Sequence, residues 1–175
     1  DRLLSRGLGD VYKRQMSLLL LGWAVGAPFS GWLSDHIGRR KPILVTGLVV
    51  ICIMLAVVTG ISDLPLGAVV ACLVVIGLSG GGMTACFGLV KDVMPAPLAG
   101  ASTGVVNSMT VASGAILQPF VGLALDFQWD GRLVDGARHY AEGDYRTAFT
   151  LVLVAAVIGL VTALSLRETP RGHVP

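Results

Sequence analysis

The sequence predicts an all-α, polytopic membrane protein with five transmembrane helices. Hydrophobic residues make up 54% of its 175 residues and charged residues only 14%, whereas an ordinary soluble domain carries about 25% charged residues. Between Lys41 and Lys91 only Asp63 is charged, and no charged residue lies between Asp92 and Asp126. Such runs are long enough to cross a hydrocarbon core of about 30 Å, and they lack the polar face that a soluble helical bundle needs.

Five apolar runs mark the expected spans. They cover residues 16–33, 43–61, 66–90, 103–125 and 147–166, with loops at 34–42, 62–65, 91–102 and 126–146. Proline, which costs least outside a helix, falls in or beside these loops at Pro42, Pro65, Pro95 and Pro97. The order is therefore span, short turn, span, with one long connection before the last span.

Residues 1–15 differ from the rest because they are polar and rich in basic side chains. Residues 5–15 read SRGLGDVYKRQ, which resembles the translation of a transposase-type sequencing adapter. We therefore expect 1–15 to be a non-native segment, which does not enter the fold prediction, and the chain to be a fragment whose upstream part is missing. The alternative is a native hydrophilic loop, which would place Lys13 and Arg14 on the outer face, against the positive-inside bias.

The distribution of basic residues predicts the orientation. Loops 34–42 and 91–102 and the tail 167–175 share one side and hold Arg39, Arg40, Lys41, Lys91, Arg167 and Arg171. The opposite side holds three bases, all in the long connection 126–146, offset there by five acids. The first side is therefore expected to be cytoplasmic, with the C-terminus inside and the connection 126–146 outside.

The turn between the first two spans carries the motif Gly31-Trp-Leu-Ser-Asp35-His-Ile-Gly38-Arg-Arg-Lys41. It resembles the signature loop of the major facilitator superfamily, roughly Gly-x-Leu-Ala-Asp-x-x-Gly-Arg-Arg/Lys, and departs from it by Ser34 in place of the common Ala. Gly31 is expected to let two helices approach closely and Gly38 to permit a tight turn.

The resemblance implies a role for each charged residue of this motif in a latch at the cytoplasmic gate, made and broken during alternating access. The residues concerned are Asp35, Arg39, Arg40 and Lys41. The alternative is that the three bases only set the topology, and for the bases we keep both roles.

The downstream sequence indicates which part of such a transporter this is. Residues 97–107 and 114–126 resemble the eleventh helix and its cytoplasmic lead-in, and Leu166-Arg-Glu-Thr-Pro170 resembles the end of many family members. Residues 16–170 would then be helices eight to twelve, a partial C-terminal six-helix bundle, and 171–175 a cytoplasmic tail. The expected partners are the lipid bilayer, a small-molecule substrate and the missing N-terminal half, in what is expected to be a bacterial inner membrane.

Small residues recur at the spacing of helix-packing stripes. The stripes are Gly22, Gly26 and Ser30 in the first span, and Gly77, Gly81, Thr84 and Gly88 in the third. Such stripes let helix backbones approach closely in lipid. We expect these glycines and Ser30 to serve helix packing.

The fourth span carries the most polar stripe, with Asn107, Thr110, Gly114 and Gln118 on one helical face. Amides in hydrocarbon are costly unless they are paired, so this face should meet protein or a water-filled cavity. Asn107 and Gln118 are the candidate substrate contacts, followed by Thr110, Thr84 and Trp23. For each of them a hydrogen bond between helices is the alternative role.

No charged residue or histidine lies in the middle of a span. A coupling carboxylate would then lie in the missing part, or the protein is a uniporter or antiporter. Drug efflux and metabolite uptake both remain open.

An intramembrane enzyme is the competing class of function. Gly77-Leu-Ser79-Gly80 resembles the nucleophile motif of rhomboid-type serine proteases, but His36, His139 and His173 all lie in loops or the tail, at the wrong depth for a base. The three cysteines, Cys52, Cys72 and Cys86, lie inside apolar runs without metal-ligand spacing. We therefore expect no enzyme activity, no cofactor and no metal site. The scattered bases also argue against nucleic-acid binding.

Overall fold

The computed structural model of the chain describes residues 2–134, 137–138 and 140–167. Its elements are α1 (Arg2–Ile37), α2 (Lys41–Gly60), α3 (Leu66–Gly80), the 3₁₀ turn η1 (Gly81–Met83), α4 (Thr84–Val93), α5 (Ala96–Gln128), β1 (Leu133–Val134), β2 (Ala137–Arg138) and α6 (Glu142–Ser165). The predicted all-α class is confirmed, since the two strands only form a small antiparallel hairpin in the long connection.

Five helical segments are long and apolar enough to cross a membrane, as predicted. They are Met16–Ile37, Lys41–Gly60, Leu66–Val93, Ala96–Gln128 and Gly143–Ser165. Most of these helices extend beyond the apolar runs, because polar residues at the membrane surface can still be helical. The clearest case is α5, which begins at Ala96 rather than near residue 103, with Pro97 in its first turn, where proline is favoured.

Two helical segments differ from the predicted spans. The third span is not one continuous α-helix, because the glycines at 80–82 tighten it into the 3₁₀ turn η1 between α3 and α4. At the other end of the chain, α1 begins at Arg2, so its backbone continues through residues 2–15, the segment that is expected to be non-native.

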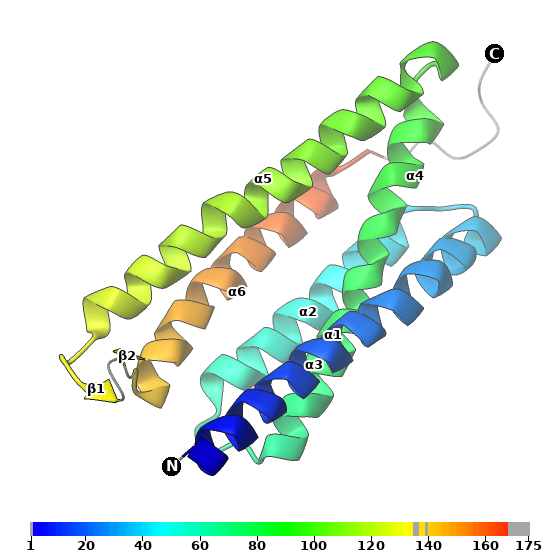
Figure 1. Cartoon of the computed structure of the whole chain (residues 1–175). Helices are drawn as coiled ribbons and strands as arrows, with labels where there is room; N and C mark the ends of the chain where they lie inside the picture. Colours follow the sequence, from blue (N-terminus) through cyan, green and yellow to red (C-terminus); the bar gives the residue numbers. More distant parts are fainter. Residues whose placement is uncertain (1, 135–136, 139, 168–175) are drawn as a thin grey trace.

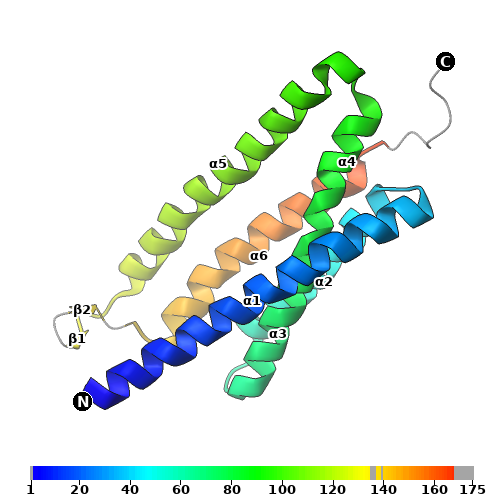
Figure 2. The same ribbon diagram turned by 45° about the vertical axis from the view of Figure 1, so that its right-hand side comes forward.

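The helices form an elongated bundle (Figure 1). α1 packs against α3 and α4, α2 against α3 and α6, and α5 against α6 and α4. The α1–α2 turn, the α4–α5 junction and the last turn of α6 lie at one end of the bundle, and the β1–β2 hairpin lies at the other (Figures 1 and 2). The loops 34–42 and 91–102, assigned from their charges to one membrane side, therefore lie at the same end.

Backbone contact between α1 and α3 is made at glycines from both helices. A Cβ atom on Gly22 would lie 2.8 Å from the carbonyl oxygen of Val74, and one on Gly26 would collide with the backbone of Leu78. In the reverse direction, a Cβ on Gly77 would collide with the Leu19 carbonyl. No larger residue fits at these positions without moving one helix away from the other.

Most large apolar side chains face outward. Phe127 is 88% exposed, and none of the residues of α5 is buried. In water such a surface would drive aggregation, whereas in a bilayer it meets lipid or further helices. The buried apolar core that the described residues do form is small and centres on Leu44, Ala85 and Ala163.

Gly26→Ala should destabilise the chain by about 1–3 kcal/mol, because the added methyl group has no room against Leu78. The matched control is Gly122→Ala in α5, where no atom lies within 4 Å of the new methyl group. The control should be neutral or stabilising by up to about 1 kcal/mol, from the higher helix propensity of alanine. Thermal unfolding in detergent measures both, and equal melting temperatures would contradict the close α1–α3 contact.

Candidate functional site

The signature turn is short because α1 ends with a glycine in the left-handed region. Gly38 has φ +71°, and its backbone N–H donates to the Ser34 carbonyl at 3.1 Å. This is the conformation that commonly terminates a helix, and only glycine adopts it without strain. The chain reverses within three residues, Gly38 to Arg40, so that α2 begins at Lys41.

The close helix approach expected at Gly31 is not seen among the described helices. Apart from its chain neighbours and the backbone of its own helix, no atom of the described residues lies within 4 Å of the position where its Cβ would stand. Among the helices described here, none uses Gly31 for close approach.

Arg40 connects the ends of two helices. Its Nη1 lies 2.8 Å from Asp35 Oδ1 in the last turn of α1, and its Nε lies 3.1 Å from Asp92 Oδ2 in the last turn of α4. A carboxylate at the C-terminal end of a helix faces the negative end of the helix dipole, so each acid needs a nearby cation. One guanidinium meets this need for both helices.

The Arg40 guanidinium is largely enclosed, with its side chain only 13% exposed. Gly88 makes the space for it, because a Cβ there would lie 2.7 Å from Arg40 Cζ. We expected Gly88 to pack against another helix with the other glycines of its stripe. In the structure it lies against a charged side chain.

Ser34 also bonds to the Arg40 guanidinium. Its hydroxyl accepts a hydrogen bond from Arg40 Nη1 at 3.1 Å and donates to the Arg39 carbonyl at 3.4 Å, and the residue is fully buried. An alanine, the usual residue of the family motif, could make neither bond. The departure from the motif therefore adds a polar contact to the turn.

Lys41 points to a different helix. Its ammonium group donates to the Leu164 carbonyl at 2.6 Å and to the Leu166 carbonyl at 2.7 Å, at the C-terminal end of α6. Arg39 is exposed at the turn, where its carbonyl accepts the Ser34 hydroxyl. Arg40 and Lys41, neighbours in the chain, thus reach the ends of different helices.

Sequence reasoning missed Asp92 and Ser34 as members of this cluster. A signal for Asp92 was present, because an acid in the last turn of a helix is unfavourable unless a base compensates for it. Ser34 gave a weaker signal, as the single departure from the motif. Neither partner could be assigned to Arg40 without knowing that α4 ends beside the turn.

The polar stripe of α5 is mostly open. Asn107 and Gln118 are exposed, while the half-buried Thr110 donates its hydroxyl to the Val106 carbonyl at 2.9 Å. Gln118 borders a shallow recess on α5 that reaches Val152 of α6.

The remaining candidates lie on the other side of the bundle. The Thr84 hydroxyl donates to the Gly81 carbonyl at 2.8 Å and lies 3.4 Å from the Ala27 carbonyl of α1. Trp23 is 45% exposed, and its Cδ1 is near Gly80. Because α5 makes no contact with α1 in the described chain, these helices do not bring Trp23 together with Asn107 and Gln118. Thr84 is the first residue of α4, which does contact α5.

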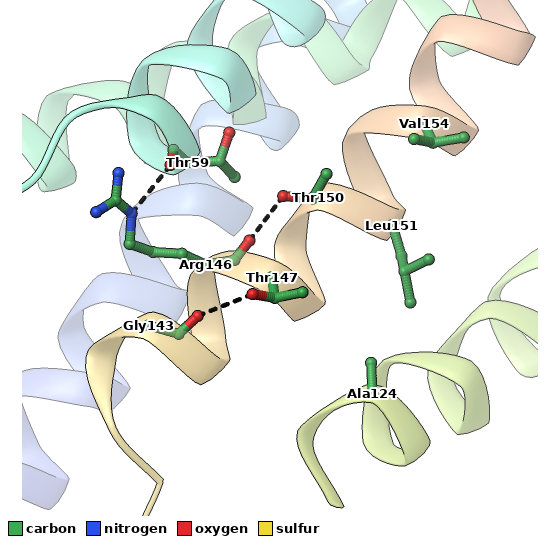
Figure 3. Close-up of a pocket in the computed structure, with 8 residues that line it drawn as sticks. All are labelled: Thr59, Ala124, Gly143, Arg146, Thr147, Thr150, Leu151 and Val154. Atoms are coloured by element: carbon green, nitrogen blue, oxygen red, sulfur yellow. Dashed lines mark hydrogen bonds between the residues drawn. The ribbon is translucent and has the colours of Figure 1, made fainter. Parts of the chain in front are cut away.

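A second site with a charged side chain lies where the start of α6 meets the end of α2 (Figure 3). Arg146, in the second turn of α6, donates to the Thr59 carbonyl at 3.0 Å and to the Ser62 hydroxyl at 2.8 Å. It borders a recess of about 540 Å³ together with Thr59, Thr147 and Thr150. The guanidinium thus meets the C-terminal end of α2.

The nearby connection is held by an exposed ion pair. Arg138 bonds to Asp126 and lies 4.7 Å from the centre of the Trp129 ring. Tyr140 donates to the same carboxylate at 2.7 Å, and this hydrogen bond raises the pKa of Tyr140 above its ordinary value. These contacts hold Asp126, at the start of the connection 126–146, beside Arg138 and Tyr140 in its later part.

Nothing in the part of the chain that the structure describes forms a group of three or more metal-binding side chains. His36 stacks on Trp32 with ring centres 5.6 Å apart, at the end of α1. His139 and His173 lie outside the described residues. Ser79 lies in the last turn of α3, and its carbonyl faces Gly47 of α2.

Comparisons with known proteins agree with the resemblance carried by the turn. Residues 10–175 match the family described as Major Facilitator Superfamily. The chain is 34% identical over 103 residues to the "Probable metabolite transport protein CsbC" of Bacillus subtilis (strain 168), covering 58% of this chain and 22% of that protein. It is 26% identical over 157 residues to "Inositol transporter 4" of Arabidopsis thaliana, covering 89% and 24%. The matches thus span about a quarter of the length of these curated relatives, and no solved structure matches the chain.

Arg40→Lys should destabilise the chain by about 1–2 kcal/mol, because a single ammonium group cannot hold both carboxylates and the Ser34 hydroxyl. Arg132→Lys is the matched control, since Arg132 is 77% exposed and pairs only with the nearby Asp130 among the contacts seen here. The control should change stability by less than about 0.5 kcal/mol. Thermal unfolding in detergent compares them, and an equally small effect at Arg40 would remove its bridging role.

Proposed function

The chain belongs to the major facilitator superfamily, and we propose that it forms part of a secondary transporter that moves a small solute across a membrane by alternating access. The observation that carries this proposal is the Arg40 cluster, a charged contact between two helix ends at the family's signature turn. The names of both relatives, a metabolite transport protein and an inositol transporter, support the same activity.

The five spans would correspond to helices eight to twelve of such a transporter. The relatives are about four times as long as the regions matched here, which leaves room for the facing half of a transport cavity. The partner of this chain would be that N-terminal half. The adapter-like origin of residues 5–15 stays a prediction, which the genomic sequence upstream of Met16 would test; the family match begins at residue 10.

We assign Asp35, Arg40 and Asp92 to the cytoplasmic latch. The contact between Arg40 and Asp35 is the more exposed of the two, with the Asp35 side chain 60% exposed against 26% for Asp92. A latch has to open and close on each cycle, which favours a pair that water can reach and weaken. The Asp92 contact would then keep Arg40 in place while the Asp35 contact is made and broken.

The side chains of these five spans are best suited to an uncharged polar metabolite as the substrate. The candidate contacts on α5 are amides and a hydroxyl, and the five spans carry no charged residue at mid-membrane. Amide and hydroxyl groups can exchange hydrogen bonds with the hydroxyls of a sugar or polyol. Multidrug efflux is the alternative within the family, and an intramembrane serine protease acting through Ser79 is much less favoured.

We propose the orientation that the charges predict, with the signature turn and the C-terminus on the cytoplasmic side, and we place the protein in a bacterial inner membrane. The end of the bundle that holds Arg39, Arg40 and Lys41 also holds Lys91 and the end of α6 (Figure 2).

Asp35→Asn in the complete transporter should lower the transport rate by about three- to tenfold while leaving membrane insertion intact, because it weakens the latch without touching the helix contacts. Asp92→Asn should have the larger effect, since its carboxylate is the less exposed partner of Arg40. Asp130→Asn, at an exposed pair on the other side, is the control. Solute uptake into vesicles measures all three, and wild-type kinetics for both latch variants would remove the latch assignment.

Gln118→Ala should raise the apparent KM for the substrate by about tenfold, which corresponds to the loss of one hydrogen bond of about 1.4 kcal/mol. Gln128→Ala is the matched control, because the Gln128 amide bonds to the Ala124 carbonyl at the end of the same helix. Uptake measured over a range of substrate concentrations separates KM from the maximal rate. An unchanged KM would leave Gln118 with a packing role only.

A further inference from the structure

α2 and α6 run antiparallel, and each carries within its first two turns a base that reaches the end of the other. Lys41, the first residue of α2, donates to the carbonyls of Leu164 and Leu166 at 2.6 and 2.7 Å. Arg146, in the second turn of α6, donates to the Thr59 carbonyl and the Ser62 hydroxyl at 3.0 and 2.8 Å. The arrangement is reciprocal, with one such contact at each membrane surface.

These contacts act on groups that a helix cannot satisfy by itself. The last four carbonyl groups of a helix have no partner within the helix, and the negative end of its dipole lies there. A cation from a neighbouring helix supplies both hydrogen bonds and charge. Because the cation and the carbonyls belong to different helices, the bond also fixes how far one helix can slide along the other.

Between the two caps the helices are in direct contact. Leu44 and Ala163 belong to the small buried core, and a Cβ atom on Gly159 would lie 3.8 Å from Leu48 Cδ2. This apolar contact is not directional, so it permits sliding and rotation. The two caps, separated by the length of a 20-residue helix, would prevent both.

We propose that Lys41 and Arg146 are reciprocal caps that hold α2 and α6 as one rigid pair, and that Lys41 is the positioning residue that couples this pair to the gate. Arg40, its neighbour in the chain, bonds to the ends of α1 and α4. A movement of the turn during gating is thereby passed to α6 through Lys41. The consequence for transport rests on the proposed function, whereas the pairing of the helices does not.

The pairing is tested by cross-linking α2 to α6 in membrane vesicles. In the complete transporter, with Cys52, Cys72 and Cys86 replaced by alanine, cysteines replace Leu48 and Gly159, and a short thiol cross-linker is added. Lys41→Met and Arg146→Met should each slow cross-linking about threefold or more, and the two together should slow it further. Lys91→Met and Arg132→Met, which remove bases at the same two ends, should leave the rate unchanged.

A conservative variant separates capping from a general loss of folding. Lys41→Arg keeps a cation that can donate to the same carbonyls, and it should restore the cross-linking rate of the parent protein. If Lys41→Met cross-links as fast as the parent protein, the cap does not hold the pair and the proposal fails. If Lys41→Arg is as slow as Lys41→Met, the effect is not that of a cation at a helix end, and the proposal fails as well.

Transport then tests the coupling to the gate. The parent protein should keep its transport rate after α2 is cross-linked to α6, because the two helices already move together. Lys41→Met should transport about threefold more slowly or worse, and cross-linking should recover part of the loss. A cross-link that stops transport in the parent protein would overturn the rigid pair. If none of the proteins transports any solute offered, the proposed function fails, while the cross-linking rates still decide whether the caps exist.

Discussion

Three helices of this chain end beside one turn, and two consecutive basic side chains of that turn bond to groups at all three helix ends. Arg40 compensates the carboxylates in the last turns of α1 and α4, and Lys41 bonds to the terminal carbonyls of α6. Helix ends carry unpaired backbone groups and a partial charge, which cannot be left unsatisfied near hydrocarbon. The position of each of these helices at this end of the bundle therefore depends on this pair of bases.

The middle of the bundle uses a different kind of contact. At Gly22, Gly26 and Gly77 the backbones of α1 and α3 touch, and cohesion comes from close packing rather than from charge. Shape thus sets the distance between helices within the membrane, and charge sets their ends at the surface. The two kinds of contact meet at Gly88, where the absence of a side chain admits the Arg40 guanidinium.

Hydropathy and charge were enough to predict the number of spans, their order and the position of the signature turn, because these depend on local composition. The helix ends were less predictable, since a helix such as α5 continues into the polar surface region, where hydropathy falls but helical geometry does not. Asp92, Ser34 and the role of Gly88 depend on which helix ends near Arg40, and no local pattern contains that information. The polar stripe of α5 was visible in the sequence, but its substrate role stays a prediction.

The 3₁₀ turn η1 between α3 and α4 has a consequence for the register of the third span. Three residues in a 3₁₀ turn rotate the chain by a full circle, about 60° more than in an α-helix, and lengthen it by about 1.5 Å. A helical wheel drawn for Leu66–Val93 as one α-helix is therefore out of phase beyond Gly81. The face of α4 that meets Arg40 is set independently of the face of α3 that meets α1, so an insertion or deletion among the glycines at 80–82 would rotate one without the other.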